Sequence, residues 1–266
     1  DVMPQFAHLP LILKPDGNGK LSKRDGDRLG FPVFPTNWTN PETGEQSSGY
    51  RERGYYPGAF NNMLAFLGWN PGTAQELFTL EELIEAFSLE RVGKAGAKFD
   101  FDKTKWFNQQ YLRQHNGEEL AAQLKPYLAE ENLEAEDTYT AQVCDLMKER
   151  ATFVHDILKE GRYFFEAPTS YDEKTIKKKW KEQTPEIIKE LRDLLEALPS
   201  FDAESIGSCF KSFLEAKELG FGAVMPGFRV SVTGLGAGAS MNDIAALLGK
   251  EEVLKRINIA LNTIKK

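Results

Sequence analysis

The sequence predicts a mainly α-helical protein. Apolar residues recur with the i, i+3, i+4, i+7 spacing of one helix face in several separate segments after residue 59. Residue types that favour helix starts precede two of these segments. Strand-type alternation is confined to 228–233, which is too brief to support a sheet. These three observations place most of the chain in packed helices.

Residues 1–58 differ from the rest because Gly, Pro, Asn and Asp are frequent and helical patterns are few. We expect loops there, around one short buried strand or helix near Leu9 to Leu13. Helices follow from Ala59 onward. In the first well-marked one, Thr79 and Glu82 form a capping box ahead of an apolar stripe. That stripe consists of Leu80, Leu83, Ile84 and Phe87.

The later helices are predicted from their apolar stripes. One long helix should carry Val143, Met147, Ala151, Val154 and Leu158 and end near Gly161. Thr184 is expected to be an N-cap followed by the first-turn residue Pro185. The stripes that follow are Ile188, Leu191, Leu195 and Leu198; Ile206, Cys209, Phe210, Phe213 and Leu214; and Val253, Leu254, Ile257, Leu261 and Ile264.

Two clusters of turn residues, at 114–117 and 167–170, suggest domain boundaries. They divide the chain into residues 1–113, 114–170 and 171–266. The two shorter units are small for independent domains, so we expect them to pack against each other.

Composition narrows the class of protein. Hydrophobic residues make up 41% of the chain and charged residues 27%, as in ordinary globular proteins. No apolar run approaches the ~20 residues that span a bilayer. A cytoplasmic, reduced protein without membrane contact is therefore expected. The net charge of -7 argues against general binding of polyanions, so any contact with RNA must be local.

Metal binding is not indicated by the Cys and His residues. The two cysteines, Cys144 and Cys209, form no CxxC pair, and the three histidines are scattered, so no zinc spacing exists. Both cysteines lie on apolar stripes and are expected to be small core residues.

The most informative segment is Lys20-Leu21-Ser22-Lys23-Arg24, in a stretch that also contains Gly17, Gly19 and Gly26. Two lysines on a glycine-rich segment predict a mobile cationic loop suited to nucleotide phosphates. A solvated charged turn is the plainer alternative. A calcium loop is rejected, because an EF-hand alignment would place Lys14 at the first ligand position and Asp25 at the twelfth.

This segment and the apolar run before it, Phe6 to Leu13, together resemble the KMSKS signature of class I aminoacyl-tRNA synthetases. The K-L-S-K-R form is typical of glutamyl-tRNA synthetases. Other blocks along the chain are similar to elements of that family in the same order. They are the G-Y-Y-P-G-A-F segment that runs to Leu67-Gly68-Trp69, K-F-D at 98–100 with W-F-N-Q-Q-Y-L-R at 106–113, P-G-F-R-V-S-V-T-G at 226–234 and L-L-G-K-E-E-V at 247–253.

The resemblance implies a role for the two lysines in forming glutamyl-adenylate from glutamate and ATP. Lys23 would be the principal phosphate contact, with Lys20 and Ser22 supporting it. Ammonium groups stabilise the negative charge that grows on the leaving pyrophosphate, which favours the transition state over the ground state. Read individually, the aromatic residues Trp69, Trp106 and Tyr111 are expected to be core residues.

The resemblance also implies how the chain is organised and what it binds. Residues 1–113 would hold the end of the catalytic domain and a stem-contact region, while 114–170 and 171–266 would be two helical subdomains of an anticodon-binding cage. Arg229 would contact the anticodon, with Arg150 as a weaker second candidate. Lys178 and Lys179 could hold the RNA backbone. Without the family, Arg229 would be interpreted as a surface salt bridge and the lysines as a solvated face.

Two departures qualify the resemblance. The family's H-I-G-H motif and Rossmann strands are absent, and residues 30–49 are longer than the usual link. The chain therefore resembles a C-terminal portion, which alone should not aminoacylate. The partners expected for the whole enzyme are tRNA-Glu, glutamate and ATP with magnesium, bound mainly by the missing half, and the protein is expected to be a monomer. The alternative is a non-catalytic helical module that binds RNA or protein, which would have no use for Lys20, Ser22 and Lys23.

Overall fold

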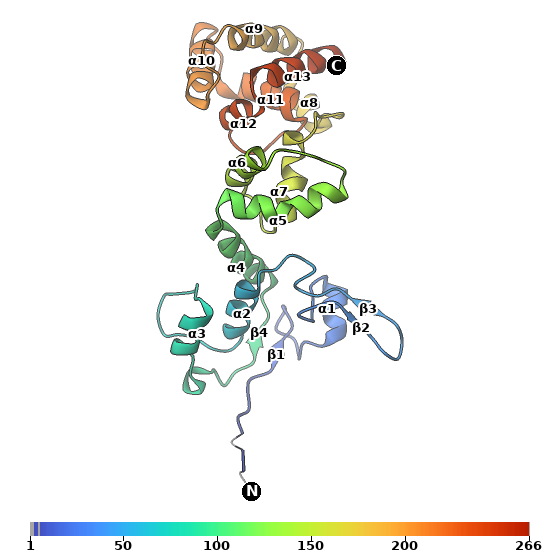
Figure 1. Ribbon diagram of the computed structural model, residues 1–266, viewed down its shortest axis with the longest axis vertical. Coiled ribbons are helices and arrows are strands. Elements are labelled where there is room, and N and C mark those ends of the chain that lie inside the picture. The colour runs from blue at the N-terminus through green and yellow to red at the C-terminus, as the bar shows by residue number, and fades with distance from the viewer. Residues whose placement is uncertain (1–2, 5, 266) are drawn as a thin grey trace. The chain divides into compact units, whose positions relative to one another are not determined.

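The computed structural model describes residues 3–4 and 6–265, which form two compact units. The first unit comprises residues up to His115 together with Ala151–His155, and the second comprises Asn116–Arg150 and Asp156 onward. Helices make up most of the second unit and are the longest regular elements of the first, which confirms the mainly α prediction (Figure 1). The predicted division of the helical part at residue 170 remains a prediction.

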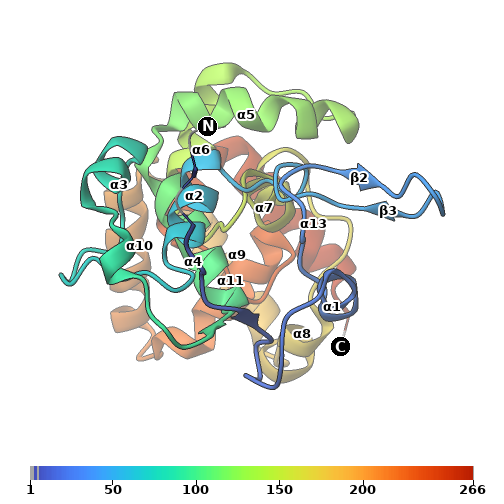
Figure 2. The same cartoon turned by 90° about the horizontal axis from the view of Figure 1, so that it is seen from below.

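The first unit combines short strands with four helices. Its elements in chain order are β1 (Ile12–Leu13), α1 (Lys23–Leu29), β2 (Trp38–Thr39), β3 (Gln46–Ser47), α2 (Pro57–Ala65), α3 (Leu80–Ala86), the 3₁₀ turn Leu89–Arg91, β4 (Ala97–Lys98) and α4 (Phe101–Gln114). Strand β1 pairs in parallel with β4, and β2 pairs antiparallel with β3. Viewed from below, β2 and β3 form a ribbon at the edge of this unit (Figure 2).

The second unit is entirely helical among its described residues. Its elements are α5 (Gly117–Glu130), α6 (Asp137–Met147), α7 (Val154–Gly161, whose first two residues belong to the first unit), the 3₁₀ turn Arg162–Phe164, α8 (Glu173–Lys179), α9 (Thr184–Glu196), α10 (Ala203–Ala216), α11 (Phe221–Thr233), α12 (Met241–Leu248) and α13 (Lys250–Thr263). Helix α11 packs against α8, α9 and α13. No described helix is both long enough and apolar enough to cross a bilayer.

Each unit has its own apolar core. In the first, α2 packs on α4 around an aromatic cluster made of Phe31, Tyr50, Tyr55, Ala59, Met63, Phe99 and Phe107. Trp69 is buried in a smaller cluster with Phe78 and Leu83, as predicted. Trp106 and Tyr111 are half-buried and pack against the aromatic cluster. In the second unit, Trp180 packs beside Val230, Ala260 and Ile264, which ties α8 to α11 and α13.

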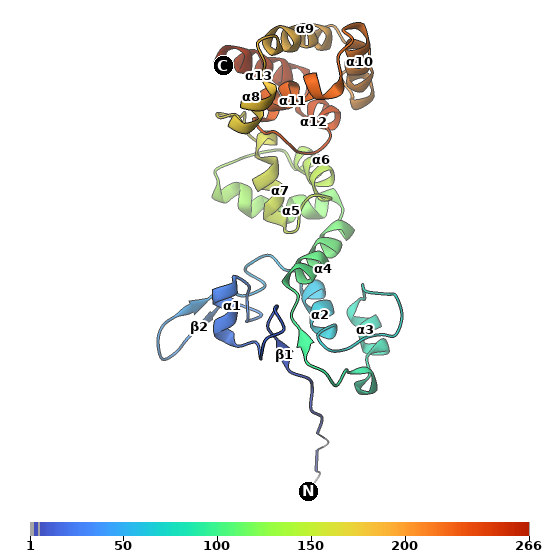
Figure 3. The same ribbon diagram turned by 180° about the vertical axis from the view of Figure 1, so that it is seen from behind.

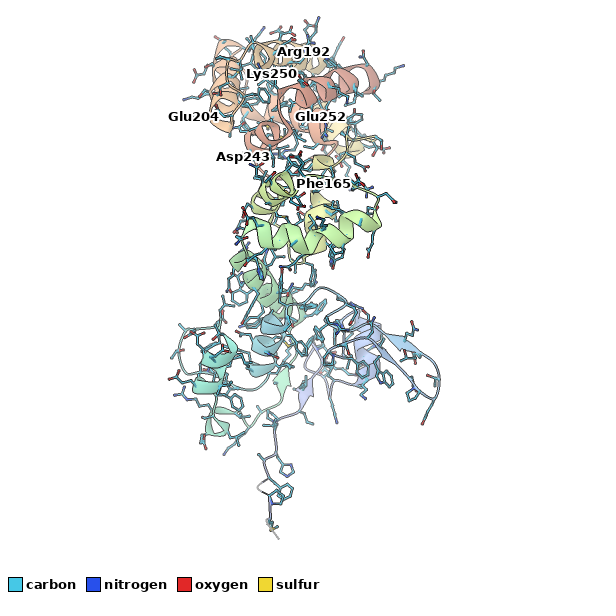
Figure 4. The ribbon with its side chains drawn as sticks, in the orientation of Figure 1. Phe165, Arg192, Glu204, Asp243, Lys250 and Glu252 are labelled. Atoms are coloured by element: carbon cyan, nitrogen blue, oxygen red, sulfur yellow. The ribbon has the colours of Figure 1, made fainter. Side chains whose placement is uncertain are left out.

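Polar contacts fix several helix ends. The capping box is confirmed, because Thr79 Oγ1 accepts from the Glu82 amide and the Glu82 carboxylate accepts from the Thr79 amide. Lys250, the first residue of α13, donates to the carbonyl oxygen of Glu196 at 2.9 Å. Figure 4 labels Lys250 of α13 and Arg192 of α9. A cation at the carboxyl end of a helix satisfies free carbonyl groups and complements the helix dipole.

Several sequence predictions need correction. The single helix predicted through Val143 and Leu158 is two helices, α6 and α7, although all five residues of the stripe are buried. The chain opens between them, where the Thr152 carbonyl accepts from Asn108 Nδ2 at 2.7 Å. The spacing of apolar residues along the sequence does not reveal this hydrogen bond to a distant residue. Thr184 is the first residue of α9 rather than its N-cap, which is Gln183.

Burial also departs from the prediction at two places. The segment near Leu9 to Leu13 was expected to be buried, but Leu9, Leu11 and Ile12 are exposed, because β1 pairs only with short partners in the described structure, the two-residue strand β4 and a bridge from Leu13 to Lys20. Cys144 is a core residue, whereas Cys209 is half-exposed on α10. The alternation at 228–233 lies within α11, where burial on nearly all sides conceals the helical period.

Candidate functional site

The signature segment, residues 20–24, begins in a tight turn and continues into α1. The Lys14 amide donates to the Gly19 carbonyl at 3.1 Å, and the Leu21 amide donates to the Ile12 carbonyl at 2.8 Å. Gly17 and Gly19 have φ angles of 79° and 86°, a region that glycine adopts without a steric penalty. The predicted loop is thus a turn closed by hydrogen bonds, and it presents Lys20 at the surface.

Ser22 and Asp25 fix the start of α1. The Asp25 carboxylate accepts from the Ser22 amide at 2.9 Å and from the Ser22 hydroxyl at 2.6 Å. It also pairs with Arg28 at 3.0 Å and with Lys14 at 3.5 Å. Hydrogen bonds from Ser22 are the main reason that the Asp25 pKa lies well below its usual range, with smaller contributions from Arg28 and Lys14 against the opposing effect of burial.

The three predicted phosphate-binding residues therefore lie together, but they differ in whether their side chains are already held by another residue. The hydroxyl of Ser22 is engaged by Asp25. The ammonium groups of Lys20 and Lys23 are on exposed residues. The side chain of Arg24 lies outside the described part of the structure. Among the described residues, the geometry thus leaves the two lysines as the cationic groups of the segment that can meet a phosphate.

Magnesium does not fit this segment. No group of three or more His, Cys, Asp or Glu residues is gathered for a metal ion in the described parts of the chain. The carboxylate of Asp25 is already held by Ser22, Arg28 and Lys14. No step of the chemistry is therefore assigned to a metal bound by these residues.

A second polar cluster, formed by Arg150, Tyr163 and Arg229, lies in the second unit. Burial raises the pKa of Tyr163 to about 12, while the positive charges of Arg229 and Arg150 oppose that increase. Burial lowers the pKa of Arg229, and the charge of Arg150 contributes to the decrease. Arg150 is exposed, whereas Tyr163 is buried. The fold thus brings together two arginines that are 79 positions apart in the sequence.

The contacts of Arg229 refine its predicted role. Its Nη2 donates to the carbonyl oxygen of Ala239 at 2.8 Å, while its Nη1 is buried without a hydrogen-bond partner. In the described structure this guanidinium meets a carbonyl group and no carboxylate, which disfavours a plain salt bridge. Arg229 also lines a cavity of about 340 Å³ together with aromatic, aliphatic and polar residues. These include Phe210, Phe221, Met225, Met241 and Asn242.

Lys178 and Lys179 lie in the last turn of α8 and are exposed. Lys177 precedes them on the same helix end, where positive charge complements the helix dipole. Trp180, directly after them, is buried against α11 and α13, so it fixes the helix end that carries the lysines. Their position is compatible with contact to an RNA backbone as well as with a solvated face.

Several neighbours of these groups were not predicted from the sequence. Asp25 could have been found from the Ser-x-x-Asp spacing that precedes a helix. Phe34 and Trp38 lie close to Lys23 but come from a segment without periodicity, so no pattern connects them. Tyr163 was hidden because its link to Arg229 spans 66 positions.

Comparison with known proteins places both units in one class. Residues 1–106 match the family described as "tRNA synthetases class I (E and Q), catalytic domain", and residues 119–261 match "Anticodon binding domain". The second match covers more than half of the chain, and the order of the two defines a class I aminoacyl-tRNA synthetase. Within that class, the chain belongs to the glutamate–tRNA ligase family.

The relatives support that assignment. The chain is 54% identical over 265 residues to a glutamate–tRNA ligase of Phocaeicola vulgatus and 52% identical over 262 residues to one of Christiangramia forsetii. These alignments cover 100% and 98% of this chain. The crystal structure of a glutamate tRNA ligase from Elizabethkingia meningosepticum, in complex with its amino acid, matches 99% of the chain with a TM-score of 0.91 and 49% identity. The chain spans about half the length of these relatives, 52% in each case.

Proposed function

We propose that this chain supplies the phosphate-binding signature segment, the stem-contact region and the anticodon-binding helices of a glutamate–tRNA ligase. The observation that carries the proposal is the ordered match of both family domains, with Lys20 and Lys23 inside the catalytic-domain match. The substrates would be glutamate, ATP and tRNA-Glu. The whole enzyme would act in the cytoplasm as a monomer.

The first unit would contribute positive charge to adenylate formation. In that step an oxygen of the glutamate carboxylate attacks the α-phosphorus of ATP, the bond from this phosphorus to the bridging oxygen breaks, and pyrophosphate leaves. Negative charge grows on the leaving group, and the ammonium groups of Lys23 and Lys20 would stabilise it. Ser22 would act indirectly, because its hydroxyl fixes Asp25 and thereby the start of α1.

The second unit would read the anticodon. Arg229 would contact the anticodon. Arg150, the second candidate, is exposed and carries a planar fork of donors, which suits a base edge in single-stranded RNA. Phe221, which is 61% exposed, borders the cavity beside Arg229 and offers a ring on which a base could stack. Lys178 and Lys179 would contact phosphates without reading sequence.

Binding of labelled tRNA-Glu to this chain, measured by fluorescence anisotropy, tests the proposal. We expect tighter binding to tRNA-Glu than to a version with an altered anticodon. Replacing Arg150 by alanine should cost about 1–3 kcal/mol and relax discrimination at one base. Lys125→Ala is the matched control, since Lys125 is an exposed cation that pairs with Asp137 at the surface. Equal affinity for the two RNAs would exclude anticodon reading.

The catalytic half of the proposal has its own test. By itself the chain should not charge tRNA, because it covers 52% of the length of its relatives. ATP–pyrophosphate exchange by the gene product that carries this chain should fall strongly when Lys23 is replaced by methionine. A chain of this length that charged tRNA-Glu with ATP would contradict the proposal. A non-catalytic binding module, the competing function, predicts no effect of Lys23.

A further inference from the structure

The ammonium group of Lys23 lies against two aromatic rings. Its Nζ is 5.2 Å from the centroid of the Phe34 ring and 5.8 Å from that of Trp38. The two rings stack on each other, with centroids 4.7 Å apart and an angle of 20° between their planes. A cation within about 6 Å of an aromatic face is attracted by the ring quadrupole. Lys23 is the first residue of α1 and Trp38 is the first residue of β2, two elements of the first unit that are labelled in Figure 3.

The rings are held by a closed segment of backbone. Trp38 is the first residue of β2 and pairs with Ser47 of β3. At the base of the ribbon, Asn37 Oδ1 accepts from the Gly49 amide at 2.9 Å. The Tyr50 amide donates to the Phe34 carbonyl at 3.0 Å, next to the aromatic core. The two rings are therefore attached to the packed part of the first unit and do not depend on Lys23 for their position.

The neighbouring charges explain why the ammonium group of Lys23 contacts aromatic rings and not a carboxylate. Asp25 lies two residues after Lys23, and Lys14, Arg28 and Ser22 already occupy its carboxylate. In the described structure, no carboxylate lies within ion-pair distance of Lys23. The rings consequently restrict the ammonium group without neutralising it.

This arrangement suits a lysine that must bind phosphate. A carboxylate partner would compete with phosphate for the same ammonium group. A cation–π contact at an exposed site is weak, so it competes less. A group that is already restricted loses less conformational freedom when it binds. We propose that Phe34 and Trp38 are positioning residues that hold the Lys23 ammonium ready for the phosphates of ATP. This inference rests on the function proposed above for Lys23.

The contact itself can be tested in this chain without catalysis. The protons on Cε of Lys23 should be shifted upfield in the NMR spectrum by the ring currents, relative to those of Lys20, which lies on the same segment. Trp38→Leu should move the Lys23 signal toward that of Lys20. Thr39→Leu, on the same strand and outside the contact, should leave it in place. Equal shifts for Lys23 and Lys20 in the unsubstituted chain would overturn the inference.

The positioning role is tested by ATP–pyrophosphate exchange in the gene product that carries this chain. Trp38→Leu should raise KM for ATP about two- to five-fold, from the strength of an exposed cation–π contact. KM for glutamate should not change, and Trp38→Phe should restore KM for ATP. Added to Lys23→Met, Trp38→Leu should have no further effect, because the two residues act through one contact.

The outcomes separate this inference from the proposed function. If Lys23→Met leaves exchange unchanged, the role proposed for Lys23 itself fails. If Lys23→Met lowers exchange strongly while Trp38→Leu leaves KM for ATP unchanged, only the positioning role is overturned. An equal rise in both KM values would also contradict it, because that result indicates general damage to the fold.

Discussion

The carboxylate of Asp25 receives hydrogen bonds from both the amide and the hydroxyl of Ser22, at 2.9 Å and 2.6 Å. Ser22 precedes α1 and Asp25 lies three residues later, so the pair ties the signature segment to the helix that follows it. The serine of the segment thus has a structural task that is visible in the fold. The lysines on either side of it remain exposed.

Asp25→Asn should loosen α1 and remove an acid-sensitive contribution to stability. The pKa of Asp25 is lower in the folded chain than the ordinary value near ~4, so its ionised form favours folding. That contribution is fully present above the unfolded pKa and is lost as the pH falls toward the folded one. Hydrogen exchange of the amides of 25–30 should be faster in the variant at neutral pH. Asp102→Asn, at a side chain that is 95% exposed, is the control and should change nothing.

Arg256→Met should destabilise the second unit by about 3–5 kcal/mol. Arg256 is only 3% exposed, and its Nη1 donates to the carbonyl oxygens of Tyr163 and Val232 at 2.7 Å and 3.2 Å. Its Nε pairs with Glu252 at 2.7 Å, so the substitution removes the buried donor that these two carbonyls and this carboxylate share.

Urea unfolding measures that loss, and the same carboxylate offers a matched control. Lys255 also pairs with Glu252, at 3.4 Å, but its side chain is 65% exposed. Lys255→Met should cost less than about 1 kcal/mol. Similar losses for the two variants would show that burial of Arg256 is not the source of its effect.

Gly117→Ala should weaken the contact between α5 and α6. A Cβ atom at Gly117 would lie 2.3 Å from the carbonyl oxygen of Ala141, which is part of the backbone and cannot move aside cheaply. We expect a loss of about 1–3 kcal/mol. Gly222→Ala is the matched control in α11, since a Cβ there meets nothing within 4 Å. It should be neutral or stabilising by up to about 1 kcal/mol, and thermal unfolding of the two variants compares them.

Replacing Lys178 and Lys179 by glutamine should weaken binding to all RNAs alike. If both contact phosphates, the slope of log affinity against log salt concentration should decrease by about one unit for each lost contact. Discrimination between tRNA-Glu and the altered anticodon should not change. Lys125→Gln, at a side chain that is 70% exposed on α5, is the control. An unchanged slope would identify the end of α8 as a solvated face.

Much of the fold could be predicted from residue patterns. The capping box at Thr79 and the stripe of Ile188, Leu191 and Leu195 depend on neighbours within one or two turns, and both were confirmed. The prediction of a single helix from Val143 to Leu158 failed because Asn108, more than thirty positions away, takes the carbonyl of Thr152. The same distinction holds for the candidate site. Lys20, Ser22 and Lys23 are neighbours in the sequence and could be predicted together. Phe34, Trp38 and Tyr163 are brought near the predicted residues only by the fold.

The sequence alone determined the helical class, the position of the cationic segment and the family resemblance, because each of these depends on residue type and short-range spacing. Only the tertiary structure decided which charged side chains have a partner and which contacts they make. It engaged Asp25 with Lys14 and Arg28, placed Lys23 against Phe34 and Trp38, and brought Arg150 near Arg229. Burial and distance determine how strongly charged groups interact, and both are set only when distant segments pack together.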